Sequence, residues 1–297
     1  MNPKDTPTDD GEARSTTEDA RVVLRRENLL PKRSFGQNFL VAPGVITKIA
    51  DACVSDAEVG AARVVEIGAG TGALTSRLVQ RARHLVAIER DRDLVPVLAR
   101  TFADEIAMGK LVLLEEDAMS VDLPALLGPP MEGSPRVLCG NLPYQITGRL
   151  LQAAIHAAPS LDRVVFMVQE EVAHRLLSPP GRKTYGALTV FVRAAFDVTR
   201  VMVVSRGSFH PAPDVTSTVV LLTPVHPPRA KETDTFRAVV KGAFGARRKT
   251  LRNAWSGLGR SPADLARIAE ACNVSLDARG ETLDVDAYAR IAAALDS

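Results

Sequence analysis

An alternation of short apolar strands with helix-like segments is the feature that most constrains the fold of this chain. Between about residues 42 and 168, segments such as 63–67 and 84–88 are almost continuously apolar, and amphipathic stretches separate them. Strands of that kind are buried on both faces, and the connecting helices cover the sheet. The pattern predicts an α/β fold of the Rossmann-like type, built on a mostly parallel sheet.

The individual elements are placed by their periodicity. Alternating apolar residues over 189–204 and 216–222 predict antiparallel strands, which would form an edge of the sheet. Amphipathic helices are expected over 45–53, 73–83 and 93–102. Buried parallel strands are expected over 63–67, 84–88, 111–114, 136–139 and 164–168.

Changes of composition divide the chain into three parts. Residues 1–25 are expected to form a disordered acidic tail, because acidic residues outnumber basic ones and large apolar residues are few. The α/β domain is expected over 26–226. Residues 227–297 show only helical periodicity, with Trp255 on an inner face, and predict a small all-α C-terminal domain.

The cysteines and histidines exclude several classes of protein. Cys53, Cys139 and Cys272 are far apart, which argues against a disulfide framework and against a zinc site, and His210 and His226 do not stand at ligand spacing. We therefore expect no metal. The N-terminus has no apolar run, and nowhere do about 18 apolar residues follow one another, so we expect a protein of the reducing cytoplasm with no membrane contact. Nothing in the sequence suggests more than a monomer, and we expect one.

A glycine-rich turn follows the first predicted strand. Glu66 ends that strand, and Gly68, Gly70 and Gly72 lead into a helix. Glycines let the backbone turn sharply and let a ligand approach it closely. Dinucleotide enzymes use similar turns, but the Gly-x-Gly-x-Gly spacing differs from their Gly-x-Gly-x-x-Gly pattern. The spacing favours S-adenosylmethionine as the cofactor.

Two carboxylates stand where a nucleoside cofactor needs them. Glu89 ends the second strand, where a carboxylate can accept both ribose hydroxyls, and Asp117 follows the third strand, where it can accept from an adenine amino group. Acids at strand ends are also common as helix caps, and this alternative stays open for both residues.

The sequence Asn141-Leu142-Pro143-Tyr144 follows another strand and carries the predicted chemistry. The lone pair of an exocyclic amine is delocalised into its aromatic ring. If the Asn141 side-chain oxygen and the Leu142 carbonyl accept the two N–H bonds, the amine is held pyramidal and becomes nucleophilic. Pro143 stiffens the turn, and Tyr144 offers a ring on which a base can stack.

Phe209 lies in a later proline-rich loop. Its ring is a candidate for the other face of an extruded base, opposite Tyr144. The alternative is an ordinary phenylalanine packed on the core.

At these residues the chain resembles the ribosomal small-subunit RNA adenine dimethyltransferase family, within the RNA adenine N6 methyltransferases. The resemblance runs from about Pro31 to the C-terminus. It rests on Ser34-Phe-Gly-Gln-Asn-Phe-Leu40, Glu66-Ile-Gly-Ala-Gly-Thr-Gly72, Asn141-Leu-Pro-Tyr144, Phe209-His-Pro-Ala-Pro-Asp-Val215 and Ala246-Arg-Arg-Lys-Thr-Leu-Arg252.

The resemblance implies a class I methyltransferase domain with a seven-stranded sheet that is mostly parallel and has an antiparallel edge. It implies that Asn38 and Leu40 contact S-adenosylmethionine, beside Gly68, Glu89, Asp117 and Asn141. It also implies the substrate: two adjacent adenines near the 3′ end of the small-subunit (16S) ribosomal RNA, each methylated twice at N6, in the immature 30S particle.

Basic residues concentrate at the start of the C-terminal domain. Residues 229–260 hold nine basic residues against two acidic ones, in a chain whose net charge is only +2. Such an excess is the footprint expected for phosphate contact, although a charge run can also be a plain solvated surface. The candidate RNA contacts, expected to share a helix end, are Arg247, Arg248, Lys249 and Arg252.

Two other functions remain as alternatives. One is a large-subunit RNA adenine methyltransferase of the antibiotic-resistance type, which would share the fold and the loop chemistry. The other is a non-catalytic RNA-binding or ribosome-assembly factor on the same fold. The intact glycine turn, Glu89 and Asn141 argue against lost catalysis.

Overall fold

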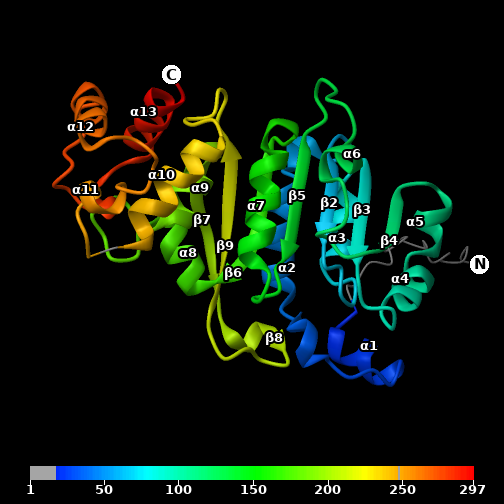
Figure 1. The fold of residues 1–297 in the computed structure, drawn as a ribbon. Helices are drawn as coiled ribbons and strands as arrows, with labels where there is room; N and C mark the ends of the chain where they lie inside the picture. Colours follow the sequence, from blue (N-terminus) through cyan, green and yellow to red (C-terminus); the bar gives the residue numbers. More distant parts are fainter. Residues whose placement is uncertain (1–17, 247) are drawn as a thin grey trace, which may run out of the picture.

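The computed structural model describes residues 18–246 and 248–297, and its centre is one twisted seven-stranded sheet (Figure 1). The strands lie in the order β4-β3-β2-β5-β6-β9-β7. Their bounds are β2 Arg63–Ile67, β3 His84–Glu89, β4 Leu111–Glu115, β5 Arg136–Asn141, β6 Arg163–Gln169, β7 Phe196–Val204 and β9 Ser217–Pro224.

The direction of the strands follows their sequence pattern. The five strands from β4 to β6 are parallel and almost wholly apolar, whereas β9 and β7 pair antiparallel at one edge. A buried parallel strand needs apolar residues on both faces, because helices cover both. The predicted Rossmann-like α/β fold, mostly parallel with an antiparallel edge, is confirmed.

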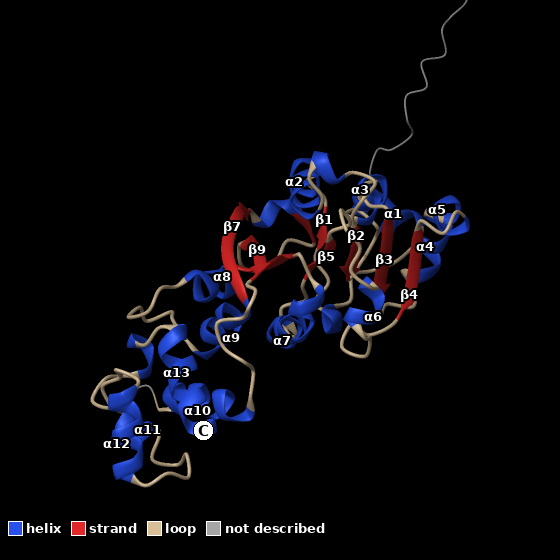
Figure 2. Cartoon of the chain, turned by 90° about the horizontal axis from the view of Figure 1, so that it is seen from above, coloured by secondary structure: helices blue, strands red, loops and turns tan. Residues whose placement is uncertain are grey.

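Helices cover the two faces of the sheet (Figure 2). On one face, α2, α3 and α4 bury apolar residues such as Ile49, Leu78 and Leu98 against the strands. On the other, α6 and α7 bury residues such as Leu127 and Leu151. These helices are α2 Pro43–Cys53, α3 Thr75–Arg81, α4 Val95–Thr101, α6 Leu123–Leu127 and α7 Thr147–Ala157, with α5 Ala103–Ala107 beside α4.

The predicted disordered tail, residues 1–25, extends too far along the chain. Helix α1, Ala20–Arg26, begins inside the stretch assigned to disorder, and Asp19 caps it by accepting from the Arg21 N–H at 2.8 Å. Leu24 packs in a small apolar cluster with Leu94. A seven-residue helix has little stability of its own, so this contact with residues far along the chain decides its structure. Residues 1–17 lie outside the described residues.

The strand predicted over 189–204 is wrong in its first half. Residues Ala187–Ala195 form helix α9, and β7 starts only at Phe196. Val192 of α9 packs against the sheet, while Val190 and Ala194 pack in the C-terminal core. A helix that is buried on two sides places apolar residues at alternate positions and so resembles a strand in sequence. Helix α8, Glu170–Leu177, precedes it.

The C-terminal region is entirely helical, as predicted. Trp255 is buried at its centre and donates from its indole nitrogen to the Val239 carbonyl at 2.8 Å. Tyr185 and α9 contribute to the same core, so the two parts of the chain share apolar contacts. The helices are α10 Asp234–Gly245, α11 Leu251–Ala254, α12 Pro262–Ala271 and α13 Val285–Asp296.

A second, two-stranded sheet lies apart from the seven-stranded one, and Figure 1 labels its strand β8 at the lower end of the fold. Strand β1, Phe39–Leu40, pairs antiparallel with β8, Phe209–His210. The pairing joins two segments that are far apart in the sequence. Among the described helices, none is long and apolar enough to cross a membrane.

Candidate active site

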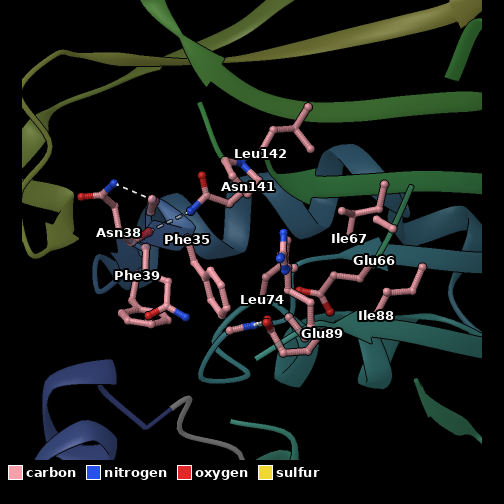
Figure 3. Close-up of a pocket in the computed structure, with 18 of the residues that line it drawn as sticks. Phe35, Asn38, Phe39, Glu66, Ile67, Leu74, Ile88, Glu89, Asn141 and Leu142 are labelled. Carbon is pink, nitrogen blue, oxygen red and sulfur yellow. Dashed lines mark hydrogen bonds between the residues drawn. The ribbon is translucent and has the colours of Figure 1, made fainter. Parts of the chain in front are cut away.

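A pocket opens where the parallel strands end, beside the β1–β8 pair (Figure 3). Chain segments after β2, β3, β4 and β5 meet there, because parallel strands bring their carboxyl ends to one edge. Most of the predicted site residues line this pocket: Asn38, Leu40, Gly68, Gly70, Glu89, Asp117, Asn141, Leu142, Pro143 and Tyr144.

The glycine-rich turn forms the floor of the pocket. Gly68 and Gly70 both have positive φ angles, of 73° and 61°, which side-chain-bearing residues rarely adopt. A Cβ on Gly70 would lie 3.2 Å from the ring of Phe39, so the turn and β1 approach closely. Glycine at position 70 therefore lets the Phe39 ring pack against the turn, while the backbone of both glycines lines the pocket.

Gly72 packs closely against the end of α4. It lies outside the set of described residues that line the pocket, and a Cβ there would lie 2.8 Å from the Phe102 ring and 3.1 Å from Leu98. The missing side chain lets α4 pack closely against the turn. Gly72 is therefore a packing residue in this structure, and its predicted role in cofactor binding stays a prediction.

Glu89 is held rigidly at the end of β3. Its side chain accepts from the backbone N–H groups of Gly70 and Asp91, both at 2.8 Å, and it is only 6% exposed. Burial raises the pKa of Glu89, although these two N–H groups oppose the rise. The carboxylate is thus fixed by the glycine turn itself and faces the pocket, where hydroxyl donors of a ligand can reach it.

Glu66 also lines the pocket, and the sequence reasoning did not assign it a role there. It is 1% exposed, and the Thr75 hydroxyl donates to it at 2.7 Å. Burial, with a smaller contribution from the charge of Glu89, raises the pKa of Glu66 from 4.5 to about 7. An acid inside an otherwise apolar strand was the available signal, since it has to be paired or functional.

This raised pKa predicts a pH-dependent stability. The Glu66 carboxyl holds its proton more tightly in the folded than in the unfolded chain, so its contribution to the free energy of unfolding is complete below about pH 4.5 and is lost as the pH rises through 7. Glu66→Gln should therefore lose less stability than the parent between about pH 5 and pH 7.5, by on the order of 2 kcal/mol. Urea unfolding of the ligand-free proteins at both pH values measures this, and an identical pH dependence would contradict it.

Asp117 lines the pocket, and its predicted contact with an adenine amino group stays a prediction. It does not cap the following helix, because Asp122 is the N-cap of α6; its side chain accepts from the Met119 N–H at 2.9 Å within its own turn. Arg90 lies 3.5 Å away as an ion-pair partner. The side chain is oriented by its own turn and remains at the pocket edge.

Asn141 is oriented by the segment that precedes β1. Its side-chain Nδ2 donates to the backbone carbonyl of Asn38 at 2.9 Å, across 103 residues of sequence (Figure 3). A carbonyl oxygen can only accept, so this contact fixes which end of the amide faces Asn38. The Oδ1 atom of Asn141 therefore points away from the Asn38 carbonyl and is available to accept a hydrogen bond from an amine.

Tyr144 is anchored by its hydroxyl, which lies 3.2 Å from the Ser217 hydroxyl of β9. The turn before α7 is tightened by the Pro143 carbonyl, which accepts from the Ile146 N–H at 3.2 Å and from the Thr147 hydroxyl at 3.1 Å. The ring of Tyr144 is thus held beside the pocket that it lines.

Phe209 is not placed as a stacking residue in this conformation. It is 5% exposed, pairs with Leu40 in the β1–β8 register, and belongs to the main apolar core. It lies outside the set of described residues that line the pocket. The bulk of a phenylalanine favours burial wherever a core is within reach, so the core alternative describes Phe209 here.

Phe35 and Gln37 line the pocket and were not among the predicted site residues. Both belong to the segment before β1, which reads in sequence only as a glycine turn. The guanidinium of Arg90 lies 4.6 Å from the centre of the Phe35 ring, a cation–π contact that ties this segment to the end of β3.

The whole of this architecture matches a known family. Residues 28–292 fit the family model described as ribosomal RNA adenine dimethylase. The chain belongs to that family. The enzyme class expected from the resemblance, an adenine dimethyltransferase of ribosomal RNA, is thereby confirmed.

The individual relatives cover almost the full chain. A protein of Geobacter metallireducens named ribosomal RNA small subunit methyltransferase A is 40% identical over 92% of this chain and 98% of its own length. The protein of the same name from Geobacillus thermodenitrificans is 37% identical, over 93% and 94%.

Solved structures show the same fold. A dimethyladenosine transferase from Plasmodium falciparum superposes with a TM-score of 0.72 at 25% identity, over 85% of this chain and 95% of that one. The 23S rRNA methyltransferase ErmE gives 0.65 at 23% identity, over 88% and 100%, which supports the fold alone.

The basic cluster of this dimethylase lies between two helices. Helix α10 ends at Gly245 and α11 begins at Leu251, so the expectation of one shared helix end is wrong. Arg248 and Lys249 are exposed in the connecting turn. Arg252, in the first turn of α11, forms an ion pair with Asp277 at 3.2 Å. Arg247 lies outside the described residues.

Proposed function

We propose that this chain transfers methyl groups from S-adenosylmethionine to N6 of two adjacent adenines near the 3′ end of 16S ribosomal RNA, and does so twice at each. Membership of the ribosomal RNA adenine dimethylase family supports the reaction class. The small-subunit target is supported by relatives at about 40% identity whose names specify the small subunit. The single observation that carries the chemistry is the fixed orientation of the Asn141 amide.

The residues of the pocket fit S-adenosylmethionine. The apolar side chains of Ile67 and Ile88 suit a purine, and the rigid carboxylate of Glu89 suits the two ribose hydroxyls. Asp117, at the edge, is placed to accept from an adenine amino group, and Asn38 and Leu40 close the opposite side. When bound there, the cofactor would supply an electrophilic methyl group on a positively charged sulfur.

The amine is activated by position and by acceptors rather than by a strong base. In the first transfer, Asn141 Oδ1 accepts one N–H of the adenine amino group and the Leu142 carbonyl accepts the other. Both hydrogen bonds draw the lone pair out of the ring and aim it into the pocket. The alkylated nitrogen then loses a proton to solvent, so in the second transfer one N–H remains for these acceptors. Because Asn141 ends β5, the strand at the centre of the sheet, and Leu142 follows it directly, their positions are held by the core.

Aromatic stacking holds the base in place. Tyr144, anchored to Ser217, provides one face. Phe209 would provide the second face only after the segment around β8 moves its ring out of the core, since it is buried in this conformation. The stacking role of Phe209 therefore stays a prediction that depends on this movement.

Labelled methyl transfer tests the proposed function. Immature 30S particles from cells that lack the modification are incubated with the protein and radiolabelled S-adenosylmethionine, and the RNA is digested to nucleosides. We expect label in N6,N6-dimethyladenosine from the small subunit. Large subunits from the same cells serve as the control. Label in large-subunit RNA, or label absent from dimethyladenosine, would contradict the proposal.

The C-terminal domain is proposed to bind the RNA backbone. The exposed turn with Arg248 and Lys249 supports this, because phosphate contacts release counterions and need accessible cations. The proposed partner is ribosomal RNA within an assembling small subunit in the cytoplasm, bound by a monomer of the protein.

Removal of these cations should weaken binding and flatten its salt dependence. For Arg248→Ala/Lys249→Ala we expect about a tenfold weaker affinity at low salt, with a slope of log affinity against log salt that is smaller by about 1–2. The matched control is Arg83→Ala/Lys110→Ala, which removes the same charge just before β3 and β4, at the opposite edge of the sheet. Filter binding across a salt series measures both variants, and equal slopes would contradict the RNA-contact role.

A further inference from the structure

Residues 32–38 form a strap across the pocket, and Asn141 depends on it. Phe35, Gly36, Gln37 and Asn38 of this strap all line the pocket. The Asn38 carbonyl accepts the Asn141 amide at 2.9 Å, so the position of the strap sets the orientation of that amide. One end of the strap is held by the pairing of β1 with β8.

The other end of the strap is held by one buried carboxylate, Asp91, which follows β3. One oxygen of Asp91 accepts from the Gln37 side chain at 2.6 Å, and the other accepts from Lys32 Nζ. The Gln37 side-chain oxygen in turn accepts the Lys32 N–H at 2.7 Å. Asp91 and Gln37 thus close the strap into a ring of hydrogen bonds.

The backbone of Asp91 serves the pocket as well. Its N–H donates to the Glu89 carboxylate at 2.8 Å, while its neighbour Arg90 lies over the ring of Phe35. The three consecutive residues at the end of β3 therefore have different contacts. Glu89 lines the pocket, Arg90 contacts the Phe35 ring, and Asp91 accepts from Lys32 and Gln37. In this way the end of β3 is coupled to the catalytic loop after β5.

We propose that Asp91 is a positioning residue of the methyl transfer, which acts through Gln37, Lys32 and the Asn38 carbonyl to hold the Asn141 amide in its reactive orientation. This inference rests on the proposed function of Asn141. It assigns Asp91 no contact with the substrate. Its effect on the rate is exerted only through Asn141.

The hydrogen bonds from Lys32 and Gln37 require an ionised carboxylate at position 91. Burial would raise the pKa of Asp91, but the contacts with Lys32 and Gln37 outweigh it and hold the pKa below its ordinary value, so the group is ionised at neutral pH. A carboxylate accepts at both oxygens, whereas an asparagine would turn a donor toward one of its two partners. Gln37 cannot reverse its own amide without losing the bond from the Lys32 N–H.

The test compares Asp91→Asn with Asp93→Asn. Asp93 also contacts Lys32, at 2.6 Å, but it is exposed, and the Gln37 side chain donates to Asp91 instead, so the Asp93 variant removes the same charge and leaves the ring intact. Single-turnover methyl transfer at saturating cofactor should be about tenfold slower for Asp91→Asn and within twofold of the parent for Asp93→Asn. Parent-like transfer by Asp91→Asn, or equal losses in both variants, would overturn the proposal.

A double variant separates positioning from general structural damage. In the Asn141→Ala background, Asp91→Asn should slow transfer by less than twofold, because the group through which Asp91 acts is gone. A repeated tenfold loss in that background would overturn the inference while leaving the proposed function intact. A parent-like rate for Asn141→Ala alone would instead overturn the role assigned to Asn141, whereas the absence of label from dimethyladenosine in the parent would overturn the proposed function.

Discussion

Replacement of Asn141 with alanine should slow methyl transfer by about a hundredfold to a thousandfold. This is the loss of rate that other enzymes show when one preorganised hydrogen-bonding group at the reacting centre is removed. The side chain is tied to the Asn38 carbonyl at 2.9 Å, so its oxygen needs no reorganisation when the amine arrives. Single-turnover transfer to small subunits measures the rate, and calorimetric titration with S-adenosylhomocysteine measures cofactor affinity, which we expect to change far less.

A second substitution at the same position tests the orientation. Asn141→Asp keeps an acceptor but loses the N–H that binds the Asn38 carbonyl, and it places a carboxylate against that oxygen. We expect it to be as slow as Asn141→Ala. Asn253→Ala is the control, since Asn253 is an exposed residue of α11. If Asn141→Ala transfers methyl groups at the parent rate, the assigned mechanism is wrong.

Replacement of Gly140 with alanine should destabilise the protein by about 3 kcal/mol, because overpacking in a tight core forces the backbone to shift. Gly140 precedes Asn141 in β5 and pairs with Ile67 of β2. A Cβ at this position would lie 2.5 Å from the Ile67 carbonyl oxygen, a contact that only separation of the two strands can relieve. Urea unfolding measures the loss. We also expect slower methyl transfer, because the strands that separate carry Asn141 and the glycine turn.

Gly148→Ala is the matched control for this prediction. Gly148 lies near the start of α7, and a Cβ there would have no neighbour within 4 Å among the described residues. An alanine in a helix is favoured over glycine, so we expect an unfolding free energy equal to the parent's or up to about 0.5 kcal/mol higher. An equal loss in the two variants would show that the close approach of β2 and β5 is not the cause.

Much of the site could be predicted because it is encoded in short local patterns. The glycine turn, Glu89, Asp117 and the residues 141–144 each follow a buried apolar strand. Since parallel strands end at one edge, their order in the chain is enough to place them around one pocket. The family motifs added Asn38 and Leu40, which strand patterns do not indicate.

The errors arose where local pattern and tertiary environment disagree. Residues 189–195 alternate like a strand but form a helix, because α9 is buried against both the sheet and the C-terminal core. Phe209 and Gly72 stand in recognisable motifs, but in this conformation the Phe209 ring packs in the core and the space beside Gly72 is filled by residues of α4 and its C-cap, so their predicted roles stay predictions. In each case a distant partner decides the packing.

The parallel strands between residues 63 and 168, the glycine turn and the catalytic loop were determined by the sequence alone, since periodicity and turn chemistry act over a few residues. Only the tertiary structure decided which way the Asn141 amide faces, that Glu66 is an acid with a raised pKa, and that Asp91 holds the strap. Those properties depend on contacts between residues up to 103 positions apart, and on exclusion of water from the pocket. Neither a contact at long range nor a low-dielectric environment exists until the chain has folded.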